Sequence, residues 1–329
     1  MKRRRFVELG ALVGVHNALI ASRSHAETSP APISGRPSIS RSGTELSYQT
    51  VSLALAALKD GDTLNIPAGS YPGQCGRVGA NNVRIRGVGG RAMFDTAVDD
   101  KAVFVVSGND VTLENVGAAG VRIAPDNGAL VRGEGGNLTL INCFTRDCNV
   151  SVLTGGPATR DSALIVTDCD FEGNSTAEDP AHGIYAGICA RLVVNGGRIA
   201  DMKGKVPGHL VKSRAAVTEI HGTLLDKVHA SRCIDVPEGG MLVIDGAARL
   251  VNSTVARNRE MIAYGAELPR DATNRCIPRF AVNEIHIAAT VVFAGANPKD
   301  NLPAYAWLIP TVLRDLHRNE PMPRYAAPS

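Results

Sequence analysis

A short strand pattern recurs through the middle of the chain, and its spacing limits the fold more than any other feature. Segments such as Leu-Thr-Leu-Ile-Asn begin at residues 111, 138, 164, 192, 217 and 242, at spacings of 27, 26, 28, 25 and 25 residues. Apolar residues alternate with polar ones in these segments, as in half-buried β-strands. Self-similarity at such a period favours stacked repeats over a globular α/β core.

A second series of short apolar segments lies between the members of the first. Its members are Leu130–Arg132, Val152–Thr154, Ile184–Tyr185, Val211–Lys212, Ile234–Asp235 and Ile262–Ala263. Two or three strands in each coil of about 25 residues, with no helix between them, predict a parallel β-solenoid. Such a fold needs no helical crossovers, because the chain reaches each parallel neighbour by winding around its own core. One more coil is expected from Glu284–Ile287 and Thr290–Phe293.

The composition agrees with an all-β chain. The sequence has 34 Gly among 329 residues, and 4% of the residues are aromatic. Abundant Gly suits many tight turns and disfavours a helical bundle, which needs long segments without Gly. The net charge of +3 is small and spread along the chain, which argues against nucleic-acid binding.

The N-terminal residues have the features of an export signal. Basic residues at 2–5, with a twin-arginine pattern, precede a moderately apolar stretch at 6–21. Small residues at positions 24 and 26 favour cleavage after Ala26. We therefore expect residues 1–26 to be a signal peptide and the mature protein to be periplasmic or secreted. The apolar stretch is too short and too interrupted for a stable membrane span.

The predicted β-helix domain spans residues 48–295. Before it, residues 27–47 are rich in Ser, Pro and Gly and are expected to be a flexible lead-in. Residues 51–58 are predicted to form a short helix that caps the first coil, which would otherwise expose apolar side chains and unpaired strand edges. The Pro-rich tail at 296–329 is expected to be irregular, and 305–317 is the candidate for a second capping helix.

Asn or Asp closes most strands of the first series. These residues are Asn115, Asn142, Asp168, Asn195 and Asp245. Side chains of this kind bond neighbouring backbone groups, and Asn tolerates left-handed geometry. We therefore interpret them as a ladder of turn residues, repeated once in each coil.

The seven Cys residues lie at 75, 143, 148, 169, 189, 233 and 276. An exported protein can oxidise its thiols, but the odd count leaves at least one outside intramolecular disulfides. Cys143 and Cys169 are 26 residues apart in similar settings, so we expect them to stack as apolar residues between coils. No C-x-x-C pair is present, which argues against a zinc site, and neither a metal nor a cofactor is expected.

Two motifs, H-G-I-Y-A-G and G-H-L-V-K-S-R-A, share one pattern. Their histidines, His182 and His209, are 27 residues apart, and so are Tyr185 and Lys212. If one repeat is one coil, each pair lies one above the other. The plainer alternative for each His is that it bonds a backbone group of a turn.

Outward-pointing residues of these strands are expected to form columns, because residues i and i+2 of a strand share a face. The main column would contain Arg132, Thr154, Tyr185, Lys212 and Asp235, and an adjacent column would contain Glu134 and Arg214. The result is a mixed, mostly basic strip that matches a linear anionic chain. Alternatively, Lys212 and Asp235 form an ion pair between adjacent coils, which adds little stability.

The regular coils, Asn-closed strands and N-terminal helix together resemble the right-handed parallel β-helix proteins of the pectate-lyase-like superfamily. The motifs H-G-I-Y-A-G and G-H-L-V-K-S-R-A, followed by I-D-V-P-E-G-G, are similar to those of exported bacterial β-helix repeat proteins. The resemblance covers residues 50–290 and implies an all-β, single-stranded right-handed parallel β-helix. The chain lacks the calcium-binding Asp clusters of pectate lyases and the paired-Asp motif of polygalacturonases.

This resemblance implies a polysaccharide lyase that acts on a uronic acid by β-elimination, or a C5-epimerase. β-Elimination requires a cation for the carboxylate, a base for the α-proton and an acid for the leaving oxygen. We expect Lys212 to be the base and Arg214 or Arg132 to be the cation. Tyr185 or His209 is expected to be the acid. The candidates for substrate binding are Arg132, His182, Asp235 and Glu238.

The sequence leaves two other functions open. A non-catalytic carbohydrate-binding or structural envelope solenoid would use the same strip without turnover. A hydrolase would need two carboxylates across a cleft, and the candidate pairs are Asp168 with Asp170 and Asp235 with Glu238. The expected partner is an acidic polysaccharide or oligosaccharide, with no nucleic acid and no stable membrane span after signal removal, and the protein is expected to be a monomer.

Overall fold

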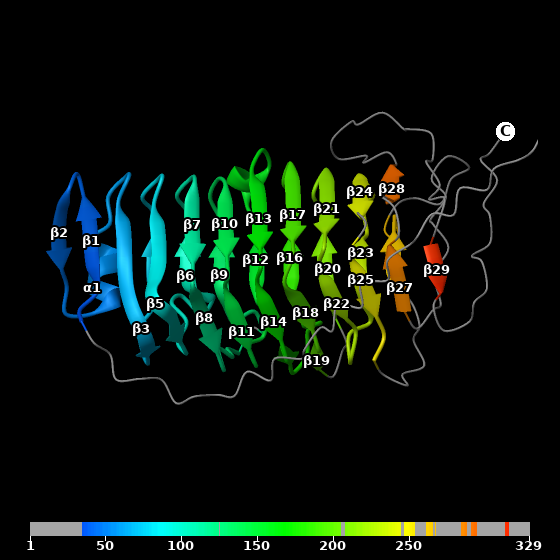
Figure 1. The fold of residues 1–329 in the computed structure, drawn as a ribbon, viewed down its shortest axis with the longest axis horizontal. Coiled ribbons are helices and arrows are strands. Elements are labelled where there is room, and N and C mark those ends of the chain that lie inside the picture. Colours follow the sequence, from blue (N-terminus) through cyan, green and yellow to red (C-terminus); the bar gives the residue numbers. More distant parts are fainter. Residues whose placement is uncertain are drawn as a thin grey trace, which may run out of the picture.

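The chain folds as a parallel β-solenoid whose coils stack along one axis (Figure 1). This computed structural model describes residues 35–124, 126–204, 208–244, 247–253, 261–265 and 267, and the strands at 284–287, 291–294 and 313–315. The predicted signal peptide lies outside the described residues. Within the described part of the chain, no helix is long and apolar enough to cross a membrane.

One wall of the solenoid is an eight-stranded sheet in which all neighbours are parallel. Its strands, in stacking order, are β4 (Gly76–Val78), β6 (Ala102–Val106), β9 (Ala129–Gly133), β12 (Val152–Thr154), β16 (Ile184–Ala186), β20 (His209–Ser213), β23 (Arg232–Val236) and β26 (Ile262–Tyr264). From β9 onward these are the strands of the second series in the sequence. The predicted all-β parallel solenoid is therefore confirmed.

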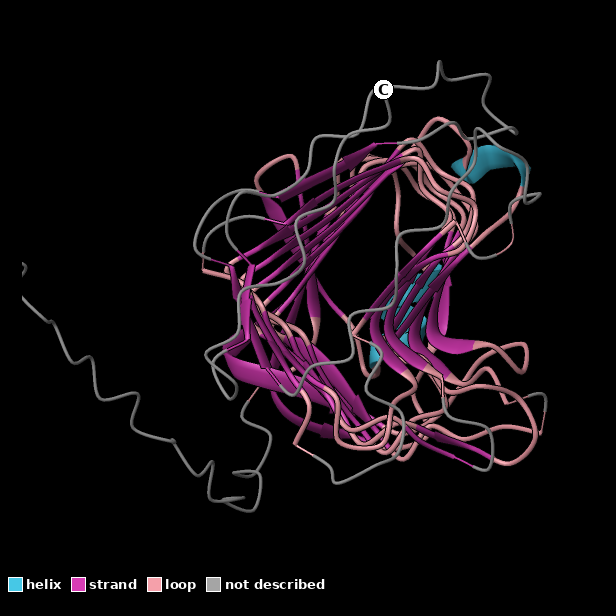
Figure 2. Cartoon of the chain, turned by 90° about the vertical axis from the view of Figure 1, so that its right-hand side faces the viewer, coloured by secondary structure: helices cyan, strands magenta, loops and turns pink. Residues whose placement is uncertain are grey.

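The other walls belong to a second sheet, whose strands come in two ranks. The first rank is β7 (Val111–Glu114), β10 (Leu138–Ile141), β13 (Ala163–Thr167), β17 (Arg191–Asn195), β21 (Val217–His221) and β24 (Met241–Ile244). The second rank is β8 (Val116–Ala119), β11 (Phe144–Arg146), β14 (Asp170–Glu172), β18 (Arg198–Ala200), β22 (Leu224–Asp226) and β25 (Arg249–Val251). Both ranks begin next to two long strands, β3 (Thr63–Tyr71) and β5 (Arg84–Phe94). β3 pairs with β5, and β5 pairs with both β7 and β8. Figure 2, viewed along the stack, shows these walls around the core.

The boundary between the two ranks is the predicted turn ladder. Asn115, Asn142 and Asp168 have φ values of 55°, 49° and 51°, in the left-handed region. The Asn142 side-chain amide donates to Oδ1 of Asn115 at 2.7 Å, which links adjacent coils. In the next coil Asn195 ends β17, and Gly196 takes the left-handed conformation with φ 66°. The ladder is confirmed for the first three positions, and Asp245 lies outside the described residues.

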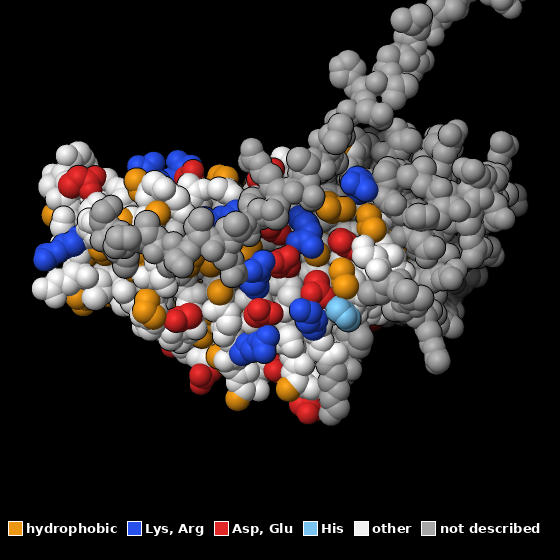
Figure 3. Space-filling view, turned by 60° about the horizontal axis from the view of Figure 1, so that its bottom comes forward, with side chains coloured by type: hydrophobic (Ala, Val, Ile, Leu, Met, Phe, Trp, Pro, Cys, Tyr) orange, Lys and Arg blue, Asp and Glu red, His pale blue; other side chains and the backbone are white. Residues whose placement is uncertain are grey.

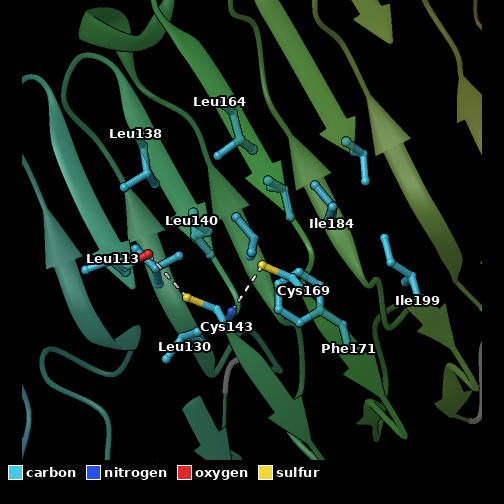
Figure 4. Packing of buried hydrophobic residues seen from close by; sticks show 14 of the residues in the cluster. Leu113, Leu130, Leu138, Leu140, Cys143, Leu164, Cys169, Phe171, Ile184 and Ile199 are labelled. Atoms are coloured by element: carbon cyan, nitrogen blue, oxygen red, sulfur yellow. Dashed lines mark hydrogen bonds between the residues drawn. The ribbon is translucent and has the colours of Figure 1, made fainter. Parts of the chain in front are cut away.

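The inside of the coils is filled with apolar side chains. Figure 4 shows Leu130 and Leu140 beside Cys143, and Phe171 beside Cys169. The backbone N–H of Cys143 donates to Sγ of Cys169 at 3.3 Å, and burial raises the pKa of the Cys169 thiol. The expectation of stacked apolar Cys residues is confirmed, since every Cys in the described part of the chain is a free thiol, and Cys276 lies outside that part.

The register of one strand differs from the sequence interpretation. Leu192 of β17 pairs with Thr218 of β21 rather than with Val217, and Thr218 in turn pairs with Leu242 of β24. Thr218 is fully buried, and its hydroxyl bonds the Ser213 hydroxyl at 2.7 Å. That hydrogen bond satisfies the Thr218 hydroxyl inside the core. Thr218 therefore takes the inward-facing position that the alternating pattern had assigned to Val217.

The first coil is capped as predicted, but with more structure than expected. Helix α1 (Val51–Ala56) begins after Thr50, whose hydroxyl accepts from the Leu53 N–H at 3.2 Å, and it buries Val51, Ala54 and Leu55. Two strands precede it, β1 (Ser38–Arg41) and β2 (Thr44–Ser47), and β1 pairs antiparallel with both β2 and β3. The expected flexible lead-in at 27–47 therefore does not extend over 38–47, where the hairpin covers the free edge of β3.

The last coil is covered by antiparallel strands. β28 (Val291–Ala294) pairs with β24, and β27 (Glu284–Ile287) pairs with β25. The prediction that these segments form one more parallel coil is therefore wrong. β29 (Leu313–Asp315) pairs antiparallel with β27, so this part of the predicted helix at 305–317 is a strand. Antiparallel pairing closes the hydrogen-bonding edge of the sheet, which a further parallel coil would have left open.

An Asn ladder that the sequence analysis missed runs along the turns before the first rank of strands. The Asn81 side-chain oxygen accepts from the Asn109 N–H at 2.9 Å, and the Asn109 oxygen accepts from the Asn137 N–H at 2.8 Å. The Asn137 oxygen in turn accepts from the Ala163 N–H at 2.9 Å. These three Asn residues are 28 residues apart, so each rung satisfies a backbone donor of the next coil.

Replacing Asn109 by alanine should lower the free energy of unfolding by about 1 kcal/mol, because the Asn137 N–H loses its acceptor. Chemical denaturation of wild-type and variant protein measures the difference. Unchanged stability would mean that water replaces the Asn109 oxygen at no cost.

Candidate functional site

The outward column predicted from the two motifs is present on β16, β20 and β23. Tyr185 pairs with Lys212, and Lys212 pairs with Asp235, on consecutive strands. Their neighbours Ile184, Val211 and Ile234 are buried in the core. One member differs from the prediction, because Leu153, and not Thr154, lies between Arg132 and Tyr185.

Arg214 is the centre of the polar contacts on this face. It follows β20, and its Nε donates to the Tyr185 hydroxyl at 3.1 Å. Its Nη1 donates to Glu238 and, at 2.8 Å, to Oε2 of Glu267. Its Nη2 donates to Oε1 of Glu267 at 3.1 Å. Burial lowers the pKa of Arg214, but the contacts with Glu267 and Tyr185 outweigh burial and raise the pKa overall, so the guanidinium is charged.

Lys212 lies against the same group of side chains. Its Nζ is 5.4 Å from the centre of the Tyr185 ring and 4.0 Å from Oε1 of Glu267. The side chain of Lys212 is 18% exposed. In place of the ion pair with Asp235 that the sequence left open, Lys212 makes a cation–π contact with Tyr185 and a long ion pair with Glu267.

Asp235 lies at the buried side of the cluster. It is 3% exposed, and its carboxyl oxygens are 3.4 Å from Nη1 of Arg232 and 3.3 Å from Nε2 of His209. Burial raises the pKa of Asp235, while the positive charges of Arg232 and Lys212 oppose the shift. A buried carboxyl next to cations is suited to hold those cations in place.

His182 and His209 lie next to each other in adjacent coils. Both are buried, and the His209 backbone N–H donates to Nδ1 of His182 at 3.0 Å. Burial lowers the pKa of His182 to about 3 and that of His209 to about 2. Both rings are therefore neutral at neutral pH, and His182 carries its proton on Nε2. A neutral, buried imidazole disfavours the expected role of His209 as an acid, and the contact of His182 fits the turn-bonding alternative.

Arg132 is outside the cluster. Leu153 separates it from Tyr185, so the two residues are about 10 Å apart at the usual strand spacing. Its Nε is 3.5 Å from Oε1 of Glu134, and Lys101 Nζ is 2.6 Å from the same oxygen. Arg214 is therefore the arginine of the cluster, and Arg132 lies outside it.

Glu267 is the member of the cluster that the sequence analysis missed. Ile262 of β26 pairs with Ile234 of β23, and the N–H of Gly265, just after β26, donates to the Val236 carbonyl at 2.8 Å. The Glu267 N–H donates to the carbonyl of Pro237 at 2.8 Å, which turns the side chain toward Arg214. A possible signal was present in the sequence, since Glu238 and Glu267 follow equivalent isoleucines by four and five residues.

The candidate pair of acids on the other sheet serves a different purpose. Asp168 belongs to the turn ladder, and Asp170 lies 3.6 Å from Nη1 of Arg198. Glu172 bonds Arg198 at 2.6 Å and also bonds Arg146 of the preceding coil. Figure 3 shows positive and negative side chains intermixed on the face that it presents, rather than separated into large patches.

Comparison with protein-family models, with curated proteins and with solved structures found no match to this chain.

Proposed function

We propose that this protein binds an acidic polysaccharide across β16, β20 and β23 and cleaves it by β-elimination at a uronic acid. The observation that carries this proposal is the group formed by Tyr185, Lys212 and Arg214. Arg214 holds a carboxylate through two parallel hydrogen bonds while its Nε contacts the Tyr185 hydroxyl. An arginine fork of this kind binds a uronate carboxylate in the same way.

The three side chains supply the three roles that the reaction needs. Arg214 neutralises the uronate carboxylate, and the Lys212 amine takes the α-proton. The electron pair of that carbon–hydrogen bond forms a carbon–carbon double bond as the bond to the glycosidic oxygen breaks. Tyr185 accepts a hydrogen bond from Arg214, so its own proton points elsewhere and can pass to the leaving oxygen. Return of the α-proton to the opposite face would instead give epimerisation.

A non-catalytic binding or structural role is the second candidate. The observation that favours it is the balance of charge, because Lys212, Arg214 and Arg232 each meet a carboxylate of the protein itself. Paired charges of this kind hold coils together without any substrate. The hydrolase alternative has less support, because Asp235 and Glu238 both contact cations of the cluster.

Turnover assays separate the first two candidates. Purified mature protein is incubated with polygalacturonate, alginate, hyaluronan and chondroitin, and formation of the unsaturated uronate is followed by its ultraviolet absorbance. The proposal expects product from one of them and loss of that product in Lys212→Ala. Lys101→Ala is the matched control, since Lys101 projects near the same sheet but pairs with Glu134.

The outcomes have distinct meanings. Product that persists in Lys212→Ala would remove Lys212 as the base. Binding of a polysaccharide without any product, and without inversion detected by NMR, would favour the non-catalytic candidate.

A further inference from the structure

Glu267 contacts the candidate site in a way that resembles a bound ligand. Its two carboxylate oxygens accept from Nη1 and Nη2 of Arg214, at 2.8 and 3.1 Å, in a parallel pair. Oε1 also lies 4.0 Å from Nζ of Lys212. One carboxylate therefore faces both Arg214 and Lys212, the two groups that the proposed reaction assigns to the carboxylate and to the α-proton of the substrate.

The two glutamates that meet Arg214 differ in burial. Glu238 is 5% exposed and contacts the guanidinium, as does the Tyr185 hydroxyl. The side chain of Glu267 is 48% exposed and lies on the outer side. An exposed ion pair contributes little stability, whereas a buried carboxylate cannot leave its cation without a large penalty. Glu267 is thus the partner that an incoming anion can replace.

The charge of the cluster also depends on Glu267. With Glu267 in place, Lys212 and Arg214 face two carboxylates, those of Glu238 and Glu267. With Glu267 displaced and Lys212 protonated, the two cations exceed Glu238 by one positive charge beside the Tyr185 hydroxyl. The site is then complementary to a single carboxylate attached to a sugar ring.

We propose that Glu267 occupies the carboxylate subsite of the acidic sugar and is displaced when the sugar binds. This inference rests on the proposed function for the identity of the ligand, a uronate. It adds that Glu267 competes with that ligand from within the protein. Binding would then break the Glu267 pair with Arg214 and re-form it with the uronate. Glu267 sets the affinity by competing for the same donors.

Replacing Glu267 by glutamine tests this inference. The substitution keeps the shape and removes the negative charge, so uronate binding should tighten by about two- to fivefold, the equivalent of one exposed ion pair. The probes are glucuronate and the oligosaccharides of galacturonate and of mannuronate, measured by isothermal titration calorimetry. Glu219→Gln is the matched control, because Glu219 accepts a similar pair of hydrogen bonds from Arg191, at 2.8 and 2.9 Å, on the other sheet. Its binding should equal that of the wild type.

A second variant and the separate probes keep the two proposals distinguishable. Glu267→Ala removes all contacts of the side chain and should tighten binding at least as much. Equal or weaker binding in both variants would overturn the inference, even if the wild type cleaves a polysaccharide. Tighter binding of glucuronate by Glu267→Gln, with no polysaccharide turned over or bound by the wild type, would support the subsite and reject the proposed function. No binding of any uronate by wild type or variants would overturn both.

Discussion

Replacing Gly108 by alanine is expected to lower the free energy of unfolding by about 3 kcal/mol, the upper end of the usual cost of overpacking. A Cβ at this position would lie 2.0 Å from the carbonyl oxygen of Ala80 and 2.8 Å from its carbonyl carbon. Both are backbone atoms of the preceding coil, so no side-chain rotation relieves the clash. The N–H groups of Ser107 and Gly108 both donate to the Val78 carbonyl, at 2.9 and 3.1 Å, which holds the two coils at this distance.

Gly79 provides the matched control for this substitution. It lies in the preceding coil, beside Ala80, and a Cβ there would meet its nearest neighbour, Ser107 Oγ, at 3.7 Å. That is an ordinary van der Waals distance, so Gly79→Ala should be nearly neutral. Denaturant unfolding of both variants measures the difference. Equal stabilities of Gly108→Ala and Gly79→Ala would show that the coils can separate locally at little cost.

Acidification from about pH 7 to pH 5 is expected to destabilise the protein by up to about 2 kcal/mol for each of His182 and His209. Burial lowers the pKa of both rings, to about 3 and about 2. The unfolded chain takes up these protons near pH 6.5, so the folded state loses stability below that pH and continues to lose it until the folded pKa values are reached. His182, Arg232 and Lys212 lower the pKa of His209 further, and Asp235 contacts its Nε2.

Substitutions that keep the hydrogen bonds without the titrating rings test this origin. In His182→Asn the side-chain oxygen can accept from the His209 N–H as Nδ1 does, and in His209→Gln the amide can donate toward Asp235. The double variant should have a flatter dependence of stability on pH in this range, where ordinary carboxyl groups remain ionised. His229→Gln is the control, because the side chain of His229 is 56% exposed. An unchanged slope in the double variant would assign the acid sensitivity to other groups.

The strands and their order could be predicted because they depend on local pattern. Alternating apolar residues at a fixed period defined both series, and the left-handed preference of Asn and Asp placed the turns at Asn115, Asn142 and Asp168. The column of Tyr185, Lys212 and Asp235 followed from the same register. These features need only the sequence, since each coil repeats the same strand and turn requirements.

Other features depend on which segments meet in space. Thr218 takes a core position because the Ser213 hydroxyl is within reach, and the antiparallel strands β27 and β28 lie on the last coil because its edge is open. The burial of His182 and His209 was likewise not visible in the motif that contains them.

The sequence by itself determined that this chain is a β-solenoid with Tyr185, Lys212 and Arg214 on one face, because a strand repeat fixes which residues stack and which point outward. The tertiary structure alone decided which partners those residues meet. Glu267 contacts Arg214, 53 residues away in the sequence, and its offset from Ile262 does not specify which side chain it meets. Charge pairing and burial depend on the three-dimensional path of such segments, and they determine whether the cations of the site are available to a ligand.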